Sequence, residues 1–204
     1  MQNKFLALCA VAALAANPGL VQAQVGNGGA TYSEVNNKTS LADFMPKFIS
    51  ASRIAIAAQA SMDTTVGMAD QANALTAQAS EMKLDSAPGI VEKVMDARAA
   101  DALALNAKLA SAGLTIDAAK KPQFTADIED LARSIKQFEE LSSDLPYMKT
   151  QLRGAGAKGR TGLFVAKSLP GYSKEMKAQL AAAVAFARAN AIPFAPEVNA
   201  ALAP

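Results

Sequence analysis

The pattern of apolar positions in the second half of the chain predicts a long amphipathic helix. Apolar side chains recur there at alternating three- and four-residue steps: Ile128, Leu131, Ile135, Phe138, Leu141, Leu145, Met148 and Leu152. This spacing places them on one helix face, as the seam of an antiparallel bundle requires. We expect Thr125 to cap this helix, and Pro146 to cause a kink or a restart capped by Asp144.

A weaker apolar stripe predicts a first helical region between Ser40 and Met82. Ser40 is suited to be its N-cap, and the apolar face begins with Leu41 and Phe44. Gly67 lies midway and weakens or bends a helix. The region is therefore one long helix or two shorter ones.

Two further helices complete the expected set. The second is capped by Ser86 or Asp85, tolerates Pro88 in its first turn, and ends at Gly113, which suits a left-handed position. The last long helix opens at Ser173 and stops before residue 193, and a short helix follows over residues 196–202.

Composition supports a helical fold, because the chain is rich in Ala, Leu, Met, Lys, Gln and Glu. Only "GLFVA" at 162–166 resembles a strand. We expect an all-α protein in which residues 40–204 form a single domain, an up-down antiparallel bundle of about four long helices. Abundant alanine on the inner faces lets the helices approach closely.

The N-terminus has the pattern of a cleaved secretory signal. Lys4 precedes an apolar run over residues 5–16, and Pro18 and Gly19 then break the helix before Ala23. This run is too short to cross a bilayer, which takes roughly 20 residues. We therefore expect a signal peptide at 1–23, a flexible segment at 24–39, an exported protein in the periplasm or outside the cell, and no transmembrane span in the mature chain.

Several kinds of chemistry are excluded by residue usage. Cys9 is the only cysteine and lies in the signal, and the chain has no histidine, so the usual ligands of transition metals and the Cys–His and Ser–His–Asp mechanisms are missing. The formal charge of the whole chain is +2, and Lys4 lies in the expected signal, so the mature chain is near neutral. A near-neutral charge argues against a dedicated nucleic-acid binder. We expect no catalytic residue, no cofactor, no metal and no sequence-specific nucleic-acid partner.

The stretch "GAGAKGRT" at 154–161 nearly matches the phosphate-binding loop G-x-x-x-x-G-K-[ST]. Arg160 stands in place of the lysine, and its planar fork differs in shape from an ammonium group. A phosphate loop follows a β-strand, whereas the preceding segment here is predicted to be helical. We expect Gly154 to end that helix, and residues 154–162 to form a mobile basic loop that binds no nucleotide.

The same region is distinctive in its charge, because residues 145–174 contain no acidic side chain. Its candidate anion- or partner-binding patch consists of Lys149, Arg153, Lys158, Arg160 and Lys167. Clustered cations of this kind attract an anionic lipid surface, a polyanion or an acidic envelope protein. In the alternative interpretation, the segment is solvated or packs over an acidic face of the same bundle.

Three functional hypotheses follow from these observations. The first is a non-enzymatic exported protein that acts by binding, as an envelope accessory, scaffold or chaperone-like module. The second is a secreted, membrane-active effector that uses amphipathic helices. The third is a hydrolase-type enzyme that uses only Asp, Glu, Lys, Tyr or Ser, which would require a deep pocket with two convergent polar side chains.

Overall fold

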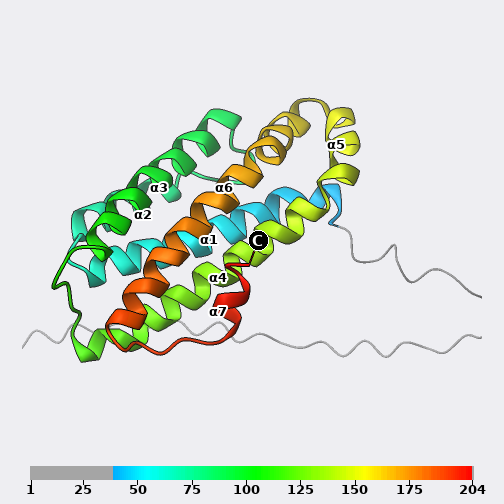
Figure 1. Ribbon diagram of the computed structural model, residues 1–204. Helices are drawn as coiled ribbons and strands as arrows, with labels where there is room; N and C mark the ends of the chain where they lie inside the picture. The colour runs from blue at the N-terminus through cyan, green and yellow to red at the C-terminus, as the bar shows by residue number, and fades with distance from the viewer. Residues whose placement is uncertain (1–38, 204) are drawn as a thin grey trace, which may run out of the picture. The chain divides into compact units, whose positions relative to one another are not determined.

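The computed structural model describes residues 39–203, except for the side chains of residues 157 and 158. All regular secondary structure in this range is helical, which confirms the all-α class. The predicted signal peptide and nearly all of the segment 24–39 lie outside the described residues. The helices are α1 (Leu41–Thr65), α2 (Ala69–Ala79), α3 (Pro88–Leu109), the 3₁₀ helix η1 (Ala118–Lys120), α4 (Lys121–Ser143), α5 (Leu145–Gly154), α6 (Gly156–Ala189) and α7 (Glu197–Ala200) (Figure 1).

The long helices α1, α3 and α6 begin at the same end of the helical domain, and α4 runs in the opposite direction (Figure 1). Helix α1 packs mainly on α4, whereas α6 packs on α3, α4 and α5. The short helix α2 returns along the second half of α1 and also contacts α3. The expected bundle of about four long alternating helices is therefore not confirmed, because the return between α1 and α3 is made by a short helix.

The first helical region is two helices rather than one. Gly67 adopts a φ of +86°, a left-handed conformation that reverses the chain between α1 and α2. At the start of α1, the Ser40 side chain accepts a hydrogen bond from the Asp43 backbone N–H at 3.2 Å, as predicted for its N-cap. Gly113 is also left-handed, with a φ of +77°, just beyond the end of α3.

Two predicted caps are wrong because their side chains form other hydrogen bonds, a tertiary one at Thr125 and local ones at Ser86. Helix α4 begins at Lys121, and the Thr125 hydroxyl donates to the Pro193 carbonyl at 2.7 Å. Helix α3 has Pro88 in its first turn as expected, but its N-cap residue is Ala87. The Ser86 hydroxyl instead accepts from the Lys83 backbone N–H at 2.7 Å.

The predicted loop at 154–162 and the helix start at Ser173 are corrected together, and the strand-like stretch at 162–166 is also helical. Helix α6 starts at Gly156 and runs through Pro170 to Ala189, and a single residue, Ala155, separates it from α5. Its buried face continues the helical period on both sides of Ser173, with Val165, Leu169, Tyr172, Met176 and Leu180. Burial of this face outweighs the low helix propensity of the glycines.

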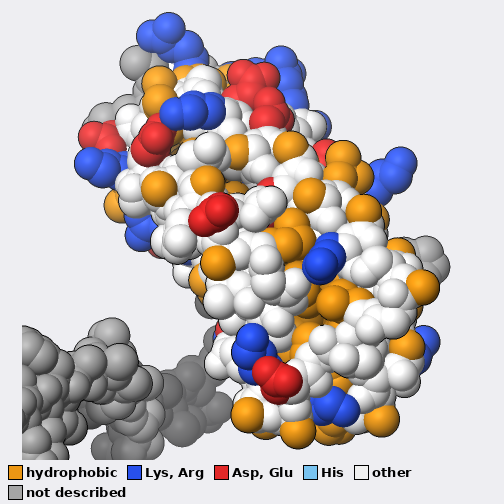
Figure 2. Space-filling model, turned by 90° about the vertical axis from the view of Figure 1, so that its left-hand side faces the viewer, with side chains coloured by type: hydrophobic (Ala, Val, Ile, Leu, Met, Phe, Trp, Pro, Cys, Tyr) orange, Lys and Arg blue, Asp and Glu red, His pale blue; other side chains and the backbone are white. Residues whose placement is uncertain are grey.

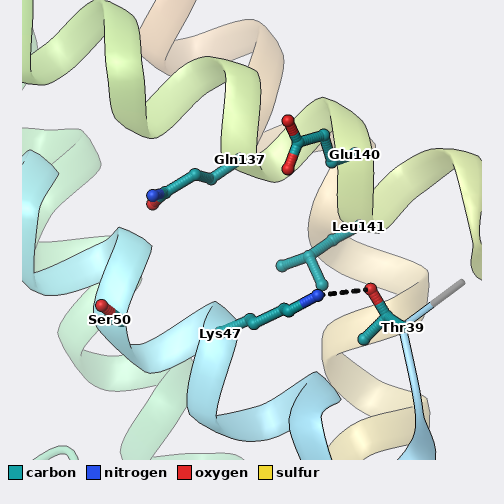
Figure 3. A pocket seen from close by; sticks show the side chains of 6 residues that line it. All are labelled: Thr39, Lys47, Ser50, Gln137, Glu140 and Leu141. Carbon is teal, nitrogen blue, oxygen red and sulfur yellow. Dashed lines mark hydrogen bonds between the residues drawn. The ribbon is translucent and has the colours of Figure 1, made fainter. Parts of the chain in front are cut away.

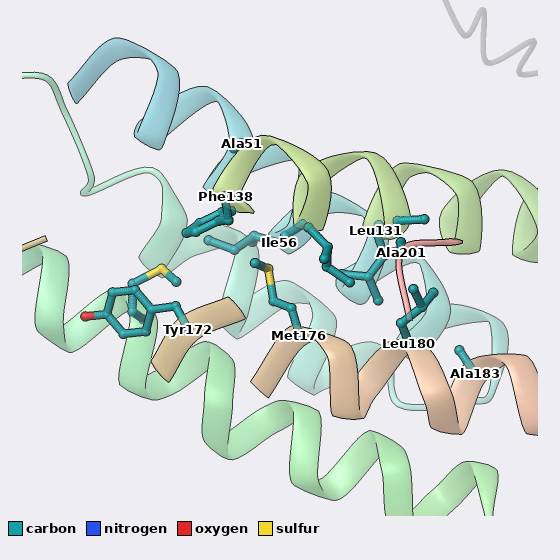
Figure 4. Packing of buried hydrophobic residues seen from close by; sticks show 14 of the residues in the cluster. Ala51, Ile56, Leu131, Phe138, Tyr172, Met176, Leu180, Ala183 and Ala201 are labelled. Atoms are coloured by element: carbon teal, nitrogen blue, oxygen red, sulfur yellow. The ribbon is translucent and has the colours of Figure 1, made fainter. Parts of the chain in front are cut away.

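The centre of the core lies where α1, α4 and α6 meet (Figure 4). The rings of Phe48 and Phe138 pack edge to face with centroids 5.5 Å apart, and the Tyr172 ring lies 6.3 Å from Phe48. Small residues bring the backbones of α1 and α4 together, since the Ser134 hydroxyl donates to the Ala51 carbonyl at 2.8 Å. Ala51 is fully buried at this interface.

The helical phase of α4 is tested by neighbouring substitutions at Phe138 and Glu139. Phe138 is fully buried, so Phe138→Ala should lower the free energy of unfolding by about 3–5 kcal/mol. Glu139 forms an exposed ion pair with Lys177, and Glu139→Ala should cost only about 0.5 kcal/mol. Urea denaturation measures both, and equal losses would contradict the packing described.

Candidate ligand-binding groove

An open groove of about 980 Å³ lies where α1, α3 and α6 begin and α5 ends. The residues that line it are Leu41, Ala42, Met45, Pro46, Leu84, Asp85, Ser86, Ala87, Pro88, Leu152, Ala155, Arg160 and Thr161. Most of these side chains are apolar, and Leu84 is 63% exposed. We call this feature the end groove. Its volume falls in the upper part of the range of ligand pockets, roughly 300–1,000 Å³.

A tight corner between α5 and α6 builds one wall of the end groove. The Ala155 backbone N–H donates to the Leu152 carbonyl at 3.2 Å, and Gly156 then turns left-handed with a φ of +60°. At Gly159 a Cβ atom would overlap the Leu152 carbonyl oxygen, and at Gly162 it would overlap the end of the Leu152 side chain. The glycines of "GAGAKGRT" therefore serve a helix corner. Gly154 is the last residue of α5, as predicted, and the left-handed residue is Gly156.

The corner is held to the opposite wall of the groove by one hydrogen bond. The Thr161 hydroxyl donates to the Ser86 carbonyl at 3.0 Å, which joins the first turns of α6 to the segment before α3. Thr161 occupies the Ser/Thr position of the phosphate-loop pattern, whose hydroxyl binds magnesium. Here its hydroxyl has a structural role. The segment that leads into "GAGAKGRT" is helix α5, as predicted from the sequence, and not a strand.

The predicted basic patch is distributed over α5 and α6. Arg160 lines the end groove, whereas Lys149 and Arg153 are exposed on α5 and Lys167 is exposed on α6. The side chain of Lys158 lies outside what the structure describes. The ion pairs among the described residues are Lys93–Glu81, Arg133–Asp130 and Lys177–Glu139, so the patch does not pack on an acidic face through ion pairs there.

The glycine corner predicts opposite effects for two glycine substitutions within α6. Gly159→Ala forces a methyl group into the Leu152 backbone and should lower the free energy of unfolding by about 1–3 kcal/mol. Gly171 is exposed and a Cβ there would meet nothing within 4 Å, so Gly171→Ala should be neutral or stabilising by up to about 1 kcal/mol. Chemical denaturation compares them, and similar effects of the two variants would contradict the corner.

A buried polar cluster, which the sequence analysis missed, joins α1, α3 and α6. Arg98 is fully buried, and its Nη2 donates to the Gln179 Oε1 atom at 2.7 Å. The Gln59 amide donates to the Arg98 carbonyl at 3.0 Å and to Asp101 Oδ2 at 2.7 Å. The sequence signal was Arg98 itself, which occupies an i+3 position after Met95 within the apolar stripe of α3.

Asp63 and Asp101 form an acid pair at the edge of this cluster. Asp63 is fully buried, and neither of its carboxyl oxygens has a donor partner among the described groups. Burial, a hydrogen bond to Asp101 and the negative charge of Asp101 raise the pKa of Asp63 to about 9. Arg98 points to Gln179 instead, so a proton on Asp63 is what allows the two carboxyl groups to lie together.

The acid pair predicts a specific dependence of stability on pH. The pKa of Asp63 is higher in the folded chain, about 9, than in an unfolded chain, about 3.9, so stability falls as pH rises between these values. Burial also raises the pKa of Asp127, to about 6, so pH 6.5–8.5 isolates Asp63. In that window the free energy of unfolding of the parent should fall with pH, and Asp63→Asn should reduce this slope by at most about 1.4 kcal/mol per pH unit.

Urea denaturation of parent and variant at several pH values measures these slopes. Asp127→Asn serves as the matched control, because it should change the slope only near and below pH 6. If the Asp63→Asn variant loses stability with pH as steeply as the parent does at pH 6.5–8.5, the acid pair is contradicted.

A smaller cavity of about 140 Å³ lies between α1 and α4 (Figure 3). Lys47, Ser50, Gln137 and Glu140 contribute polar side chains to it. The Lys47 ammonium group donates to the Thr39 hydroxyl at 3.3 Å and points away from Ser50 (Figure 3). The lysine and the serine therefore do not form a nucleophile–base pair, which would require a hydrogen bond between them.

On the face drawn in Figure 2, hydrophobic side chains surround a shallow hollow in the lower half, and charged side chains gather towards the upper edge. Large exposed hydrophobic residues among those described are Leu84, Leu103 and Tyr147, and of these only Leu84 lines the end groove. The end groove thus combines an exposed apolar residue with a defined concave shape, as binding surfaces do.

Comparison of the chain with protein-family models, curated proteins and solved structures found no significant match. Within residues 39–203, no cluster of three or more His, Cys, Asp or Glu side chains could hold a metal ion. No helix in the same range has both the length and the hydropathy to cross a bilayer. The interpretation of function therefore rests on the end groove and the residues around it.

Proposed function

We propose that this protein is an exported, non-enzymatic binding protein that takes the apolar part of a ligand into the end groove. The observation that carries the proposal is the groove itself, about 980 Å³ in volume and lined mainly by apolar side chains from the ends of four helices. Burial of such surface by a ligand contributes about 25 cal/mol for each Å² removed from water. An envelope accessory or chaperone-like role, in the periplasm or outside the cell, is consistent with such binding and with the signal-like N-terminus.

The rigid frame of the groove supports the same proposal. Leu152 lies against Gly159 and Gly162 of the glycine corner, and the Thr161–Ser86 hydrogen bond links the two walls. Sites on fixed helices lose little conformational entropy when a ligand binds. The groove is therefore suited to repeated uptake and release of a small apolar molecule.

Filling the groove should abolish the binding of a neutral apolar probe. Ala42 and Ala87 line the groove and are exposed, so Ala42→Phe and Ala87→Phe place a ring in it without disturbing the core. Each should weaken the binding of N-phenyl-1-naphthylamine at least about five-fold, which is roughly 1 kcal/mol. Fluorescence titration measures this affinity.

The matched control is Ala104→Phe, at an exposed alanine on α3 that lies outside the groove lining. It should leave probe affinity unchanged, and circular dichroism should confirm the same fold in all three variants. If the two filled variants bind the probe as tightly as the parent, the end groove is not the binding site.

A further inference from the structure

The hydroxyl groups of the end groove are already engaged within the protein. The Thr161 hydroxyl donates to the Ser86 carbonyl at 3.0 Å. The Ser86 hydroxyl accepts from the Lys83 backbone N–H at 2.7 Å and donates to the Glu81 carbonyl at 3.3 Å. A bound peptide would find few side-chain partners for its backbone groups, and unpaired buried polar groups cost free energy. An alkyl chain has no such groups to satisfy.

Two charged side chains of the lining, unlike its hydroxyl groups, are available to a ligand. Arg160 and Asp85 are both exposed, and neither forms a hydrogen bond or ion pair with another residue in the part of the chain described. Arg160 therefore has a free guanidinium group at the edge of an apolar surface. Such a group matches a carboxylate with two parallel hydrogen bonds.

The charge around Arg160 favours an anionic head group over a cationic one. Lys149 and Arg153 are exposed on α5 and Lys167 is exposed on α6, while residues 145–174 contain no acidic side chain. These cations produce a positive potential on the Arg160 side of the groove. Asp85, on the segment before α3, is the acidic residue of the lining and disfavours an anion close to itself.

We propose that the end groove binds a single long-chain carboxylate of the fatty-acid type, with its alkyl chain along Met45, Leu84 and Leu152 and its carboxylate on Arg160. This inference rests on the proposed function and names the ligand class of the same groove. The apolar lining selects the chain, and the free guanidinium group selects the charge of the head group.

Displacement of N-phenyl-1-naphthylamine by three ligands of equal chain length tests the proposal. Myristate, myristyl alcohol and tetradecyltrimethylammonium carry a negative, neutral and positive head group on the same alkyl chain, and each is used below its micellar concentration. Myristate should displace the probe at the lowest concentration and the cationic ligand at the highest. The advantage of myristate over the alcohol should shrink in 1 M salt, where the Debye length is roughly 3 Å.

Charge variants locate the head group. Arg160→Gln should weaken myristate binding about five-fold and leave the alcohol unchanged, whereas Arg160→Lys should retain most of the affinity. Arg153→Gln removes the same charge one residue from Leu152 but outside the lining, and should change affinity by less than about two-fold. Asp85→Asn should strengthen myristate binding, by up to about two-fold.

The outcomes separate the ligand class from the proposed function. If myristate and the alcohol displace the probe equally, or if Arg160→Gln binds myristate as tightly as the parent, Arg160 does not recognise a carboxylate. Binding of apolar ligands in the groove is unaffected by that result. Probe binding that survives the Ala42→Phe and Ala87→Phe substitutions overturns the proposed function as well. Displacement by apolar peptides but not by myristate would assign the groove to a partner peptide. A concentration-dependent dimer that Ala42→Phe abolishes would assign it to a second copy of the chain. Either result would overturn the fatty-acid proposal.

Discussion

The close contact between Gly159 and the Leu152 backbone is the constraint on which the end groove depends. With only Ala155 between them, α5 and α6 meet at an angle that no larger residue at position 159 would permit without movement of the backbone. The corner brings Leu152, Arg160 and Thr161 to the end where α1 and α3 begin. One hydrogen bond, from Thr161 to the Ser86 carbonyl, then connects the corner to the segment before α3. A local glycine requirement in the sequence thus sets the shape of an apolar groove that carries a free guanidinium group.

The interior of the domain combines two kinds of contact with different consequences. Around the Phe48–Phe138 ring pair the contact is apolar, and small residues such as Ala51 and Ser134 bring α1 and α4 together. The contact between α3 and its neighbours is more polar, because Arg98 hydrogen-bonds to Gln179 on α6 and Gln59 reaches Asp101 from α1. Buried polar contacts add less net stability than apolar packing, and they are sensitive to loss of one partner. The α3 side of the domain is accordingly the side whose stability depends on the protonation of Asp63.

The sequence allowed accurate prediction where one signal dominated. The regular seam over residues 128–152 gave the buried face of α4 and α5, and the restart at Asp144 is seen at the start of α5. Gly67 was expected to weaken or bend a helix and Gly113 to end one, and both residues are left-handed. Prediction was wrong where a glycine-rich stretch can serve either of two structural roles, a flexible loop or a close contact between helices. In residues 154–162 the glycines indicated a loop, but they provide clearance between two helices, a property that depends on a contact with Leu152 rather than on local propensity. The same error displaced the start of α6 to Ser173. The buried cluster was missed because the partners of Arg98 come from helices far apart in the sequence, Gln59 on α1 and Gln179 on α6. Of the candidate patch, charge alone suggested Arg160, but only the fold places Arg160 beside an apolar groove and Lys149, Arg153 and Lys167 outside its lining.

The central claim is that the end groove is a ligand site whose apolar wall and single arginine act together. The most direct measurement is a crystal structure of the protein grown in the presence of myristate. The account predicts continuous electron density for one alkyl chain between Met45, Leu84 and Leu152, with its carboxylate within hydrogen-bonding distance of the Arg160 guanidinium group. Density for the chain elsewhere on the protein, or in the groove with the carboxylate directed away from Arg160, would contradict it.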